Sequence, residues 1–382
     1  MTTSHLKRTT LIFAAILMVQ FTNAQTSFER KFKRSEIYSG IEVGSKGVKM
    51  SIIEVGKNAQ SQGTFNTLKD TSINTDFISF TAENFNATLN ALTDLFNQSK
   101  SQYNIAPDKI FTAVSSGVMI QAEKEQKLPM VNAFADSFKI RIGELQREVP
   151  LIDVMEEARL SHLGIIPAEK RYSTFLIDIG SGNTKGGYFP YGNTNELKLF
   201  QLSWGTKSVV NGTDKRTAGD ESLDNFKKQL FRVIEGPANT EIVYAVNVSG
   251  AYNMSDNIAF SGGIAWATAS LMYPELMDNP VVPVTYTAVE KFAEKLYADY
   301  ASVSDDAILQ SLTGAGLDKS AIVKQVKTVN KVFDQKAMMG GVSLLLKIMR
   351  QFEGLYDQKQ FYLIKNGQVG WISAFVDQHI SK

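Results

Sequence analysis

Two spacings of apolar residues run along this chain and predict a protein of mixed α/β structure. Short apolar runs bounded by turn residues are typical of strands, whereas apolar residues three or four positions apart, as at Phe85, Leu89 and Leu92, are typical of amphipathic helices. The strand pattern predicts a hairpin at 36–55 and strands at 63–67, 109–115, 242–249 and 361–364. The helix pattern predicts helices at 83–99, 129–138, 221–233, 286–332, 337–352 and 371–379. Strand-to-helix transitions are expected at 151–166, 202–210 and 258–271.

Residues 175–189, FLIDIGSGNTKGGYF, predict a second hairpin whose turn carries unusual chemistry. An apolar strand leads to Asp178, and the turn and the start of the return strand supply Gly180, Ser181, Gly182, Asn183 and Lys185. Successive N–H groups in such a turn form a concave anion site, and a carboxylate at a strand end suits a metal ion or a water molecule. An ordinary hairpin with an Asp near its turn is the alternative.

The first hairpin repeats this arrangement near the start of the chain. Its sequence at 38–53 places Glu42 after an apolar run, followed by Gly44, Ser45 and Lys46 and then a second apolar run. Two acid-then-glycine hairpins far apart in the sequence predict two related half-domains that face each other across a cleft. One anion-binding turn from each side would then hold one phosphate chain.

Two further stretches carry candidate site residues. Glu156 and Glu157 lie in the first turn of the helix predicted within 151–166, where acids often only complement the helix dipole. Gly262 and Gly263 lie between a strand and a helix, where their bare backbone permits close approach of either a ligand or packed backbone.

Composition excludes several kinds of chemistry. The 382 residues include no Cys, which excludes disulfides, thiolate catalysis and zinc–cysteine sites. Three His are too few for a His-rich metal site. Because 40 basic residues nearly balance 39 acidic ones, no overall field attracts nucleic acid or a membrane surface. Hydrolytic chemistry would therefore depend on carboxylates, hydroxyls, lysines and backbone groups.

The first residues have the pattern of a secretory signal peptide. Lys7 and Arg8 precede an apolar run at 11–21, and small residues up to Ala24 offer a cleavage site. The run is too short for a membrane anchor, and no Cys follows it for lipidation. We expect 1–24 to be removed and the mature protein, from Gln25 onward, to be periplasmic or secreted.

Taken together, these motifs resemble those of the exopolyphosphatase and guanosine pentaphosphate phosphohydrolase family, which belongs to the superfamily of actin, sugar kinases and heat-shock ATPases. IEVGSKG from Ile41, IDVMEEARLSHLG from Ile152 and IDIGSGNTK from Ile177 resemble three family motifs in order and spacing. FSGGIA from Phe260 and VFDQKAMMGG from Val332 resemble later ones. The resemblance implies two ribonuclease-H-like α/β domains with a ligand cleft between them. It places the first domain at 36–168, the second at 169–370 and a C-terminal helix at 371–382.

The resemblance also implies a role for each site residue. Glu157 matches the proposed general base, Asp178 and Glu42 match positions that hold a divalent cation, here Mg²⁺, and the glycine-rich turns match phosphate-binding loops. The expected phosphate-binding residues are Gly44, Ser45, Lys46, Gly180, Ser181, Gly182, Asn183, Lys185, Gly262 and Gly263. Such a site would use metal-assisted attack of water on a terminal phosphoryl group.

Departures from the family pattern favour a second interpretation. Glu42 replaces an Asp, Lys185 replaces a Glu, and Met119 stands where the family has a phosphate-binding Arg. These changes shift the predicted cleft from holding a metal toward holding an anion, although exposed lysines are often only solvated. The sequence thus predicts either an exopolyphosphatase-like hydrolase or a catalytically inactive, exported binder of polyphosphate or another phosphorylated anion. An ATP-binding, kinase-like protein is a third option, which export disfavours, and a homodimer is one option for the assembly.

Overall fold

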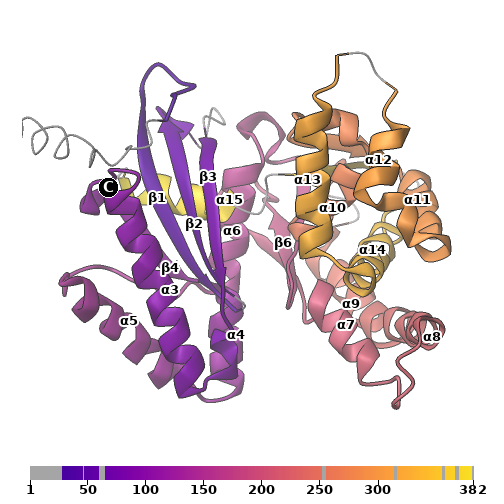
Figure 1. Cartoon of the computed structure of the whole chain (residues 1–382), viewed down its shortest axis with the longest axis horizontal. Helices are drawn as coiled ribbons and strands as arrows, with labels where there is room; N and C mark the ends of the chain where they lie inside the picture. The colour runs from indigo at the N-terminus through magenta and orange to yellow at the C-terminus, as the bar shows by residue number, and fades with distance from the viewer. Residues whose placement is uncertain are drawn as a thin grey trace, which may run out of the picture.

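The computed structural model describes residues 28–45, 47–59, 65–251, 255–313, 316–354, 358–365 and 370–380. These residues form two α/β lobes that stand side by side (Figure 1). Among them, no helix combines the length and the apolar character that crossing a membrane requires. The predicted signal peptide at 1–24 lies outside the described residues.

The first lobe is built on a four-stranded sheet with the order β3-β2-β1-β4. Strands β1 (Ser35–Gly44), β2 (Gly47–Gly56) and β3 (Phe65–Asn74) form an antiparallel meander. Strand β4 (Ile110–Val114) adds parallel to β1. Apolar residues of one face pack against α3 (Ala82–Ser101) and α5 (Leu128–Ile142), and Phe77, Phe96, Phe134 and Phe138 are among the fully buried side chains of this core. The short helix α4 (Ser116–Lys124) follows β4.

The second lobe repeats this topology and extends it. Its six strands have the order β7-β6-β5-β8-β10-β9. Strands β5 (Thr174–Ile179), β6 (Thr184–Tyr188) and β7 (Lys198–Leu202) form the meander, and β8 (Asn257–Ser261) adds parallel to β5 as β4 does to β1. Strands β10 (Gln360–Ile364) and β9 (Val281–Val284) complete the sheet. The shared meander confirms the prediction of two related halves.

Helices of the second lobe bury a large apolar core against its sheet. They are α7 (Thr206–Asp214), α8 (Leu223–Val233), α9 (Asn239–Ser249), α10 (Gly263–Met272), α11 (Tyr286–Ala298), α12 (Asp305–Ser311), α13 (Lys319–Val332) and α14 (Gln335–Met349). A π-helical turn at Ile234–Ala238, with Pro237 inside, joins α8 to α9.

Two helices connect the lobes. Helix α6 (Val154–Ile165) contacts β5 and β6 of the second sheet, and α15 (Gly370–Ile380) returns to pack on α6, β1 and β2 (Figure 1). A methyl group added to Gly164 would lie only 1.9 Å from the carbonyl oxygen of Gly370, so the glycine lets the two helices approach closely. The open face of the first sheet is thereby covered by α6 and α15.

Two sequence predictions of secondary structure are wrong. Residues 242–249 form most of helix α9 rather than a strand. The predicted helical region at 286–332 is not continuous, because 3-10 turns and caps separate α11, α12 and α13. The hairpins, the helix at the C-terminal end of the described residues and the strand-to-helix transitions at 202–210 and 258–271 are confirmed.

Candidate functional site

Both hairpins present an acid and a lysine in the same register. Glu42 on β1 lies opposite Lys49 on β2, and Asp178 on β5 lies opposite Lys185 on β6. Each acid stands two residues before the glycine that ends its strand or opens its turn. Cross-strand neighbours of opposite charge attract each other, so each hairpin carries its own counter-charge.

Lys185 joins the two carboxylates that the sequence analysis assigned to catalysis and metal binding. Its Nζ lies 2.9 Å from Oε1 of Glu157 and 3.7 Å from Oδ2 of Asp178. The side chain of Lys185 is 8% exposed and that of Glu157 is 3% exposed, so the attraction within the pair is screened little by water. Burial opposes the charge on Lys185, but Glu157 and Asp178 outweigh it and raise the pKa of the amine above its usual value. Lys185 therefore remains an ammonium ion.

Glu157 is placed by the start of α6. Asp153 caps this helix by accepting a hydrogen bond from the N–H of Glu156, and Glu156 pairs with Arg159 on the outer side of the helix. The next residue, Glu157, points inward, where Oε2 accepts a hydrogen bond of 2.7 Å from the backbone N–H of Ser116 at the start of α4. The buried hydroxyl of Ser116 has no partner among the described residues. Both oxygens of Glu157 are thus held by donors of the chain itself.

Asp178 and Glu42 are shifted toward their neutral forms. For Asp178, burial and the Glu157 carboxylate raise the pKa, against the opposing effects of Lys185 and of a hydrogen bond of 3.2 Å from Ser261 Oγ to Oδ1. For Glu42, burial is the largest cause and Glu157 the second, and together they raise the pKa to about 7. The indole N–H of Trp371 on α15 donates a hydrogen bond of 3.2 Å to Glu42 Oε2.

This arrangement does not fit a Mg²⁺ site. Among the described residues, no three or more His, Asp or Glu side chains are grouped so that they could hold a metal ion. The Lys185 ammonium lies against the oxygens that would face such an ion, and it repels a divalent cation. The Mg²⁺ expected from the sequence stays a prediction that these donors do not favour.

The start of helix α7 holds the turn of the second hairpin, at 180–183, in place. The N–H of Thr206 donates to the carbonyl oxygen of Gly180 at 3.0 Å, and the N–H of Lys207 donates to that of Ser181 at 2.8 Å, so the start of α7 binds the turn through its carbonyl groups. Ser181 and Gly182 remain exposed, as does the side chain of Lys207. The exposed turn and this lysine are the part of the predicted phosphate site that solvent reaches.

The glycines between β8 and α10 serve close packing. Gly262 has φ +90°, and a methyl group there would lie 2.3 Å from the carbonyl oxygen of Ile179 and 2.7 Å from Asp178 Oδ1. A methyl group on Gly263 would lie 3.1 Å from the ring of Phe333. Gly262 thus packs against the end of β5 and Gly263 against the ring of Phe333, while their role in phosphate binding stays a prediction.

The remaining predicted residues are placed as follows. In the first turn, Gly44 pairs with Gly47, and Ser45 lies beside the start of α4, since a methyl group on Gly117 would lie 2.9 Å from Ser45 Oγ; Lys46 lies outside the described residues. Asn183 closes the second turn by accepting a hydrogen bond from the N–H of Gly180. Met119 is half-buried on α4.

Sequence reasoning missed Lys49, Ser116, Ser261 and Trp371. Lys49 follows Glu42 by the same interval that separates Lys185 from Asp178, and this signal was readable in the sequence. Trp371 is 329 residues from Glu42, and no local pattern indicates that contact.

Comparisons with known proteins identify the fold. Neither protein-family models nor curated protein sequences match the chain. Solved structures do: a member of the Ppx/GppA protein family from Aquifex aeolicus is 14% identical, with a TM-score of 0.59 over 91% of this chain and 98% of that chain. An exopolyphosphatase from Cytophaga hutchinsonii is 13% identical, with a TM-score of 0.57 over 90% of this chain and 98% of that one. The chain therefore has the two-domain, actin-like fold of the Ppx/GppA proteins, as the sequence predicted.

Proposed function

We propose that this protein is a divergent, exported relative of the exopolyphosphatases that binds phosphate chains without hydrolysing them. The observation that carries the proposal is the position of Lys185, whose ammonium group lies between Glu157 and Asp178. A general base must be free to accept a proton from water, and both oxygens of Glu157 are already held by Lys185 and by the Ser116 N–H. The fold shared with phosphatases supports a phosphorylated ligand, and export is proposed on the signal-like N-terminus alone.

The charges at the cleft are compatible with an anion. Three carboxylates from Glu42, Glu157 and Asp178 would repel phosphate, but Lys185 and Lys49 offset two of them. Because the pKa of Glu42 is raised to about 7, this side chain is about half protonated near neutral pH. The turns and Lys207 can then hold phosphate oxygens through N–H groups and a positive charge.

The test compares binding with turnover in the same preparation. The chain from Gln25 onward is incubated with long-chain polyphosphate, with Mg²⁺ or with a chelator, while free phosphate is measured and binding is followed by calorimetry. We expect saturable binding in both conditions and no phosphate release above that of Glu157→Gln. Mg²⁺-dependent release that Glu157→Gln abolishes would overturn the proposal and restore the hydrolase interpretation. Absence of binding would overturn it as well.

A further inference from the structure

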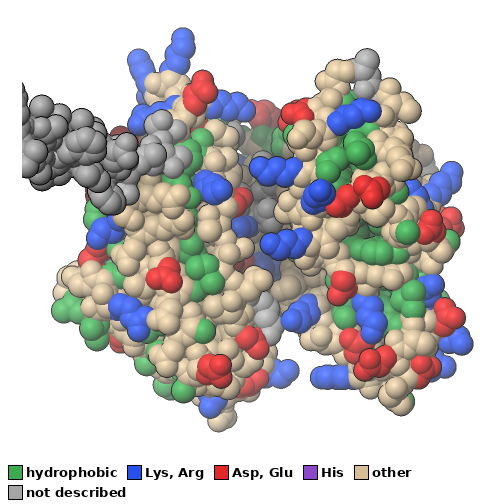
Figure 2. Space-filling view, in the orientation of Figure 1, with side chains coloured by type: hydrophobic (Ala, Val, Ile, Leu, Met, Phe, Trp, Pro, Cys, Tyr) green, Lys and Arg blue, Asp and Glu red, His purple; other side chains and the backbone are tan. Residues whose placement is uncertain are grey.

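Helix α13 carries a row of lysines that the site described above does not use. Lys324, Lys327 and Lys331 share one exposed face with Ser320 and Thr328, and together with Val323 they line a shallow hollow of about 400 Å³. The opposite face of the helix buries Ile322, Val326 and Val329 in the core of the second lobe. In Figure 2, Lys and Arg side chains gather along the edge of the second lobe that faces the first lobe, where Figure 1 places α13.

The row has no counter-charge on its own helix. No Asp or Glu occurs between Lys319 and Val332, and no ion pair among the described residues includes these three lysines. Of the acids near α13, Asp305 on α12 accepts a hydrogen bond from Asn330 of α13 itself, and Asp334 caps α14; neither forms an ion pair with the row. Like charges three and four residues apart on a helix repel each other, so this face is destabilised until an anion covers it.

The row also leads to the candidate site. Phe333, directly after α13, packs against Gly263 at the start of α10. Gly262 in turn lies against Asp178, since a methyl group there would be 2.7 Å from its Oδ1. Lys331 is therefore the end of the row nearest the cleft, and Lys324 lies about 10 Å further along the helix axis.

We propose that the lysine row formed by Lys324, Lys327 and Lys331 binds the outer part of a linear polyphosphate whose end lies at the turn of Ser181 and Gly182. A single phosphate is too small to reach both places, whereas a chain of phosphates carries regularly spaced negative charge along its whole length. The row thus makes the protein selective for long chains over orthophosphate. This inference rests on the proposed function, because it extends the same cleft.

The test uses the whole mature chain and a matched pair of triple variants. One variant carries Lys324→Gln, Lys327→Gln and Lys331→Gln. The other carries Lys100→Gln, Lys291→Gln and Lys295→Gln, which removes the same charge from exposed positions on α3 and α11. Binding of long-chain polyphosphate, tripolyphosphate and orthophosphate is measured by calorimetry at several salt concentrations.

We expect the α13 variant to lose about tenfold or more of its affinity for long chains and to show a weaker salt dependence, with orthophosphate binding unchanged. The control variant should bind like the wild type. If the α13 variant binds long chains as the wild type does, the inference is overturned while the proposed function stands. If the wild type binds none of the three ligands, both fall. If the wild type binds single-stranded RNA as tightly as long-chain polyphosphate, and the α13 variant loses both affinities equally, the assignment of the row to polyphosphate is overturned.

Discussion

Lys185 Nζ lies 2.9 Å from Glu157 Oε1 and thereby joins the second lobe to helix α6 through a buried ion pair. In the hydrolase predicted from the sequence, Glu157 activates water and Asp178 faces a metal. Here the single ammonium of Lys185, on the strand next to that of Asp178, lies beside both carboxylates and contacts Glu157 more closely. Under the proposed function, the chain keeps these acids for their place in a phosphate-binding cleft, and its own cation occupies the position where hydrolysis needs a free base.

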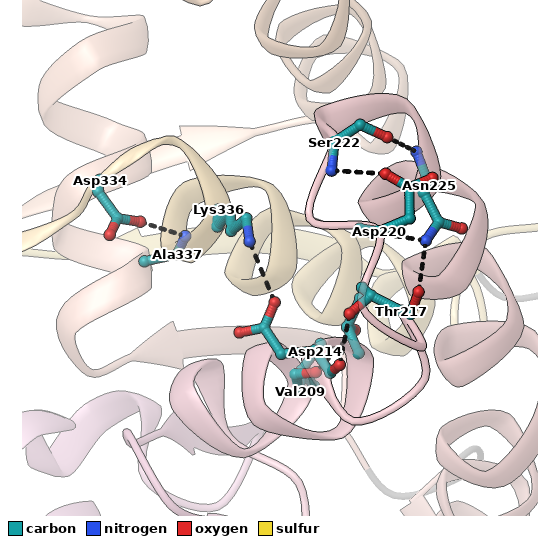
Figure 3. A network of polar contacts seen from close by, with 10 residues as sticks. Val209, Asp214, Thr217, Asp220, Ser222, Asn225, Asp334, Lys336 and Ala337 are labelled. Carbon is teal, nitrogen blue, oxygen red and sulfur yellow. Dashed lines mark hydrogen bonds and ion pairs between the residues drawn. The ribbon is translucent and has the colours of Figure 1, made fainter.

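Removing the ammonium group should destabilise the fold. We expect Lys185→Met to lower the free energy of unfolding by about 3–5 kcal/mol, because Glu157 is left buried without its partner. Denaturant titration measures this. The control is Lys336→Met, which breaks a pair of 3.2 Å with Asp214 whose side chains are 33% and 45% exposed (Figure 3) and should cost at most about 1 kcal/mol. Equal losses of unfolding free energy in the two variants would show that the buried Lys185–Glu157 pair contributes no more to stability than an exposed pair.

Reversing the charge should create a metal requirement. Lys185→Glu restores the acid of the family pattern and places a third carboxylate beside Glu157 and Asp178. We expect this variant to melt at a lower temperature than the wild type without metal, and to recover stability when Mg²⁺ is added, because carboxylate oxygens are the ligands that Mg²⁺ prefers. The wild-type melting temperature should not respond to Mg²⁺. A wild-type protein stabilised by Mg²⁺ as much as the variant would contradict the reading of Lys185 as a built-in cation.

Glu42 should make stability depend on pH near neutrality. Its pKa rises from 4.5 to about 7 on folding, so the folded protein keeps a proton that the unfolded chain loses between these values. The stability contributed by this proton falls as pH rises through that window, by about 3 kcal/mol in total, and is lost above it. Glu42→Gln cannot ionise and should therefore be more stable than the wild type at about pH 8, with little difference at about pH 4.

Melting temperatures of both proteins across this pH range provide the measurement. His162 is buried and neutral, and burial is the main reason why its pKa is lowered to about 4. The folded protein therefore loses stability as pH falls below 6.5. This loss is the same in both proteins and cancels in the difference between their melting temperatures. A constant difference between the two proteins across the range would mean that Glu42 does not titrate in the window its surroundings imply.

Two glycines near the cleft should respond differently to substitution. Gly262→Ala forces a side chain onto a residue at φ +90° and places its methyl group 2.3 Å from the Ile179 carbonyl oxygen, so we expect a loss of several kcal/mol or failure to fold. Gly182→Ala meets no atom within 4 Å and should change stability by about 1 kcal/mol or less. Thermal melts of the two variants decide this. A well-folded Gly262→Ala would show that the junction of β8 and α10 has more freedom than its geometry indicates.

Much of the fold could be predicted from the sequence, because a local sequence pattern indicates each hairpin. An apolar run, an acid and a glycine turn occur twice, and they predicted two related halves correctly. The segment 242–249 misled because its β-branched residues favour a strand, although Ile242, Ala245, Val246 and Ser249 are buried at helical spacing in α9. In this segment the spacing of the apolar residues indicates the helix correctly, whereas their β-branched side chains do not.

The candidate site was predicted less completely, because its contacts are made in three dimensions. The sequence indicated Glu157, Asp178 and Lys185 as cleft residues, but it led us to expect Lys185 to face an anion. In the structure its ammonium lies against two carboxylates, Asp178 on the neighbouring strand β5 and Glu157 on helix α6. Which group an inward-facing lysine meets depends on how α6 packs beside β6, and no local pattern reports that.

We propose that this protein binds a phosphate chain and leaves it intact. Phosphorus NMR separates binding from hydrolysis: long-chain polyphosphate is mixed with a stoichiometric amount of the chain from Gln25 onward and Mg²⁺, and the spectrum is followed over time. We expect broadening of the polyphosphate resonances on binding and no growth of the orthophosphate signal beyond that seen with Glu157→Gln. Growth of that signal with the wild type alone would show that Glu157 still acts as a base despite Lys185, and would contradict the proposed function.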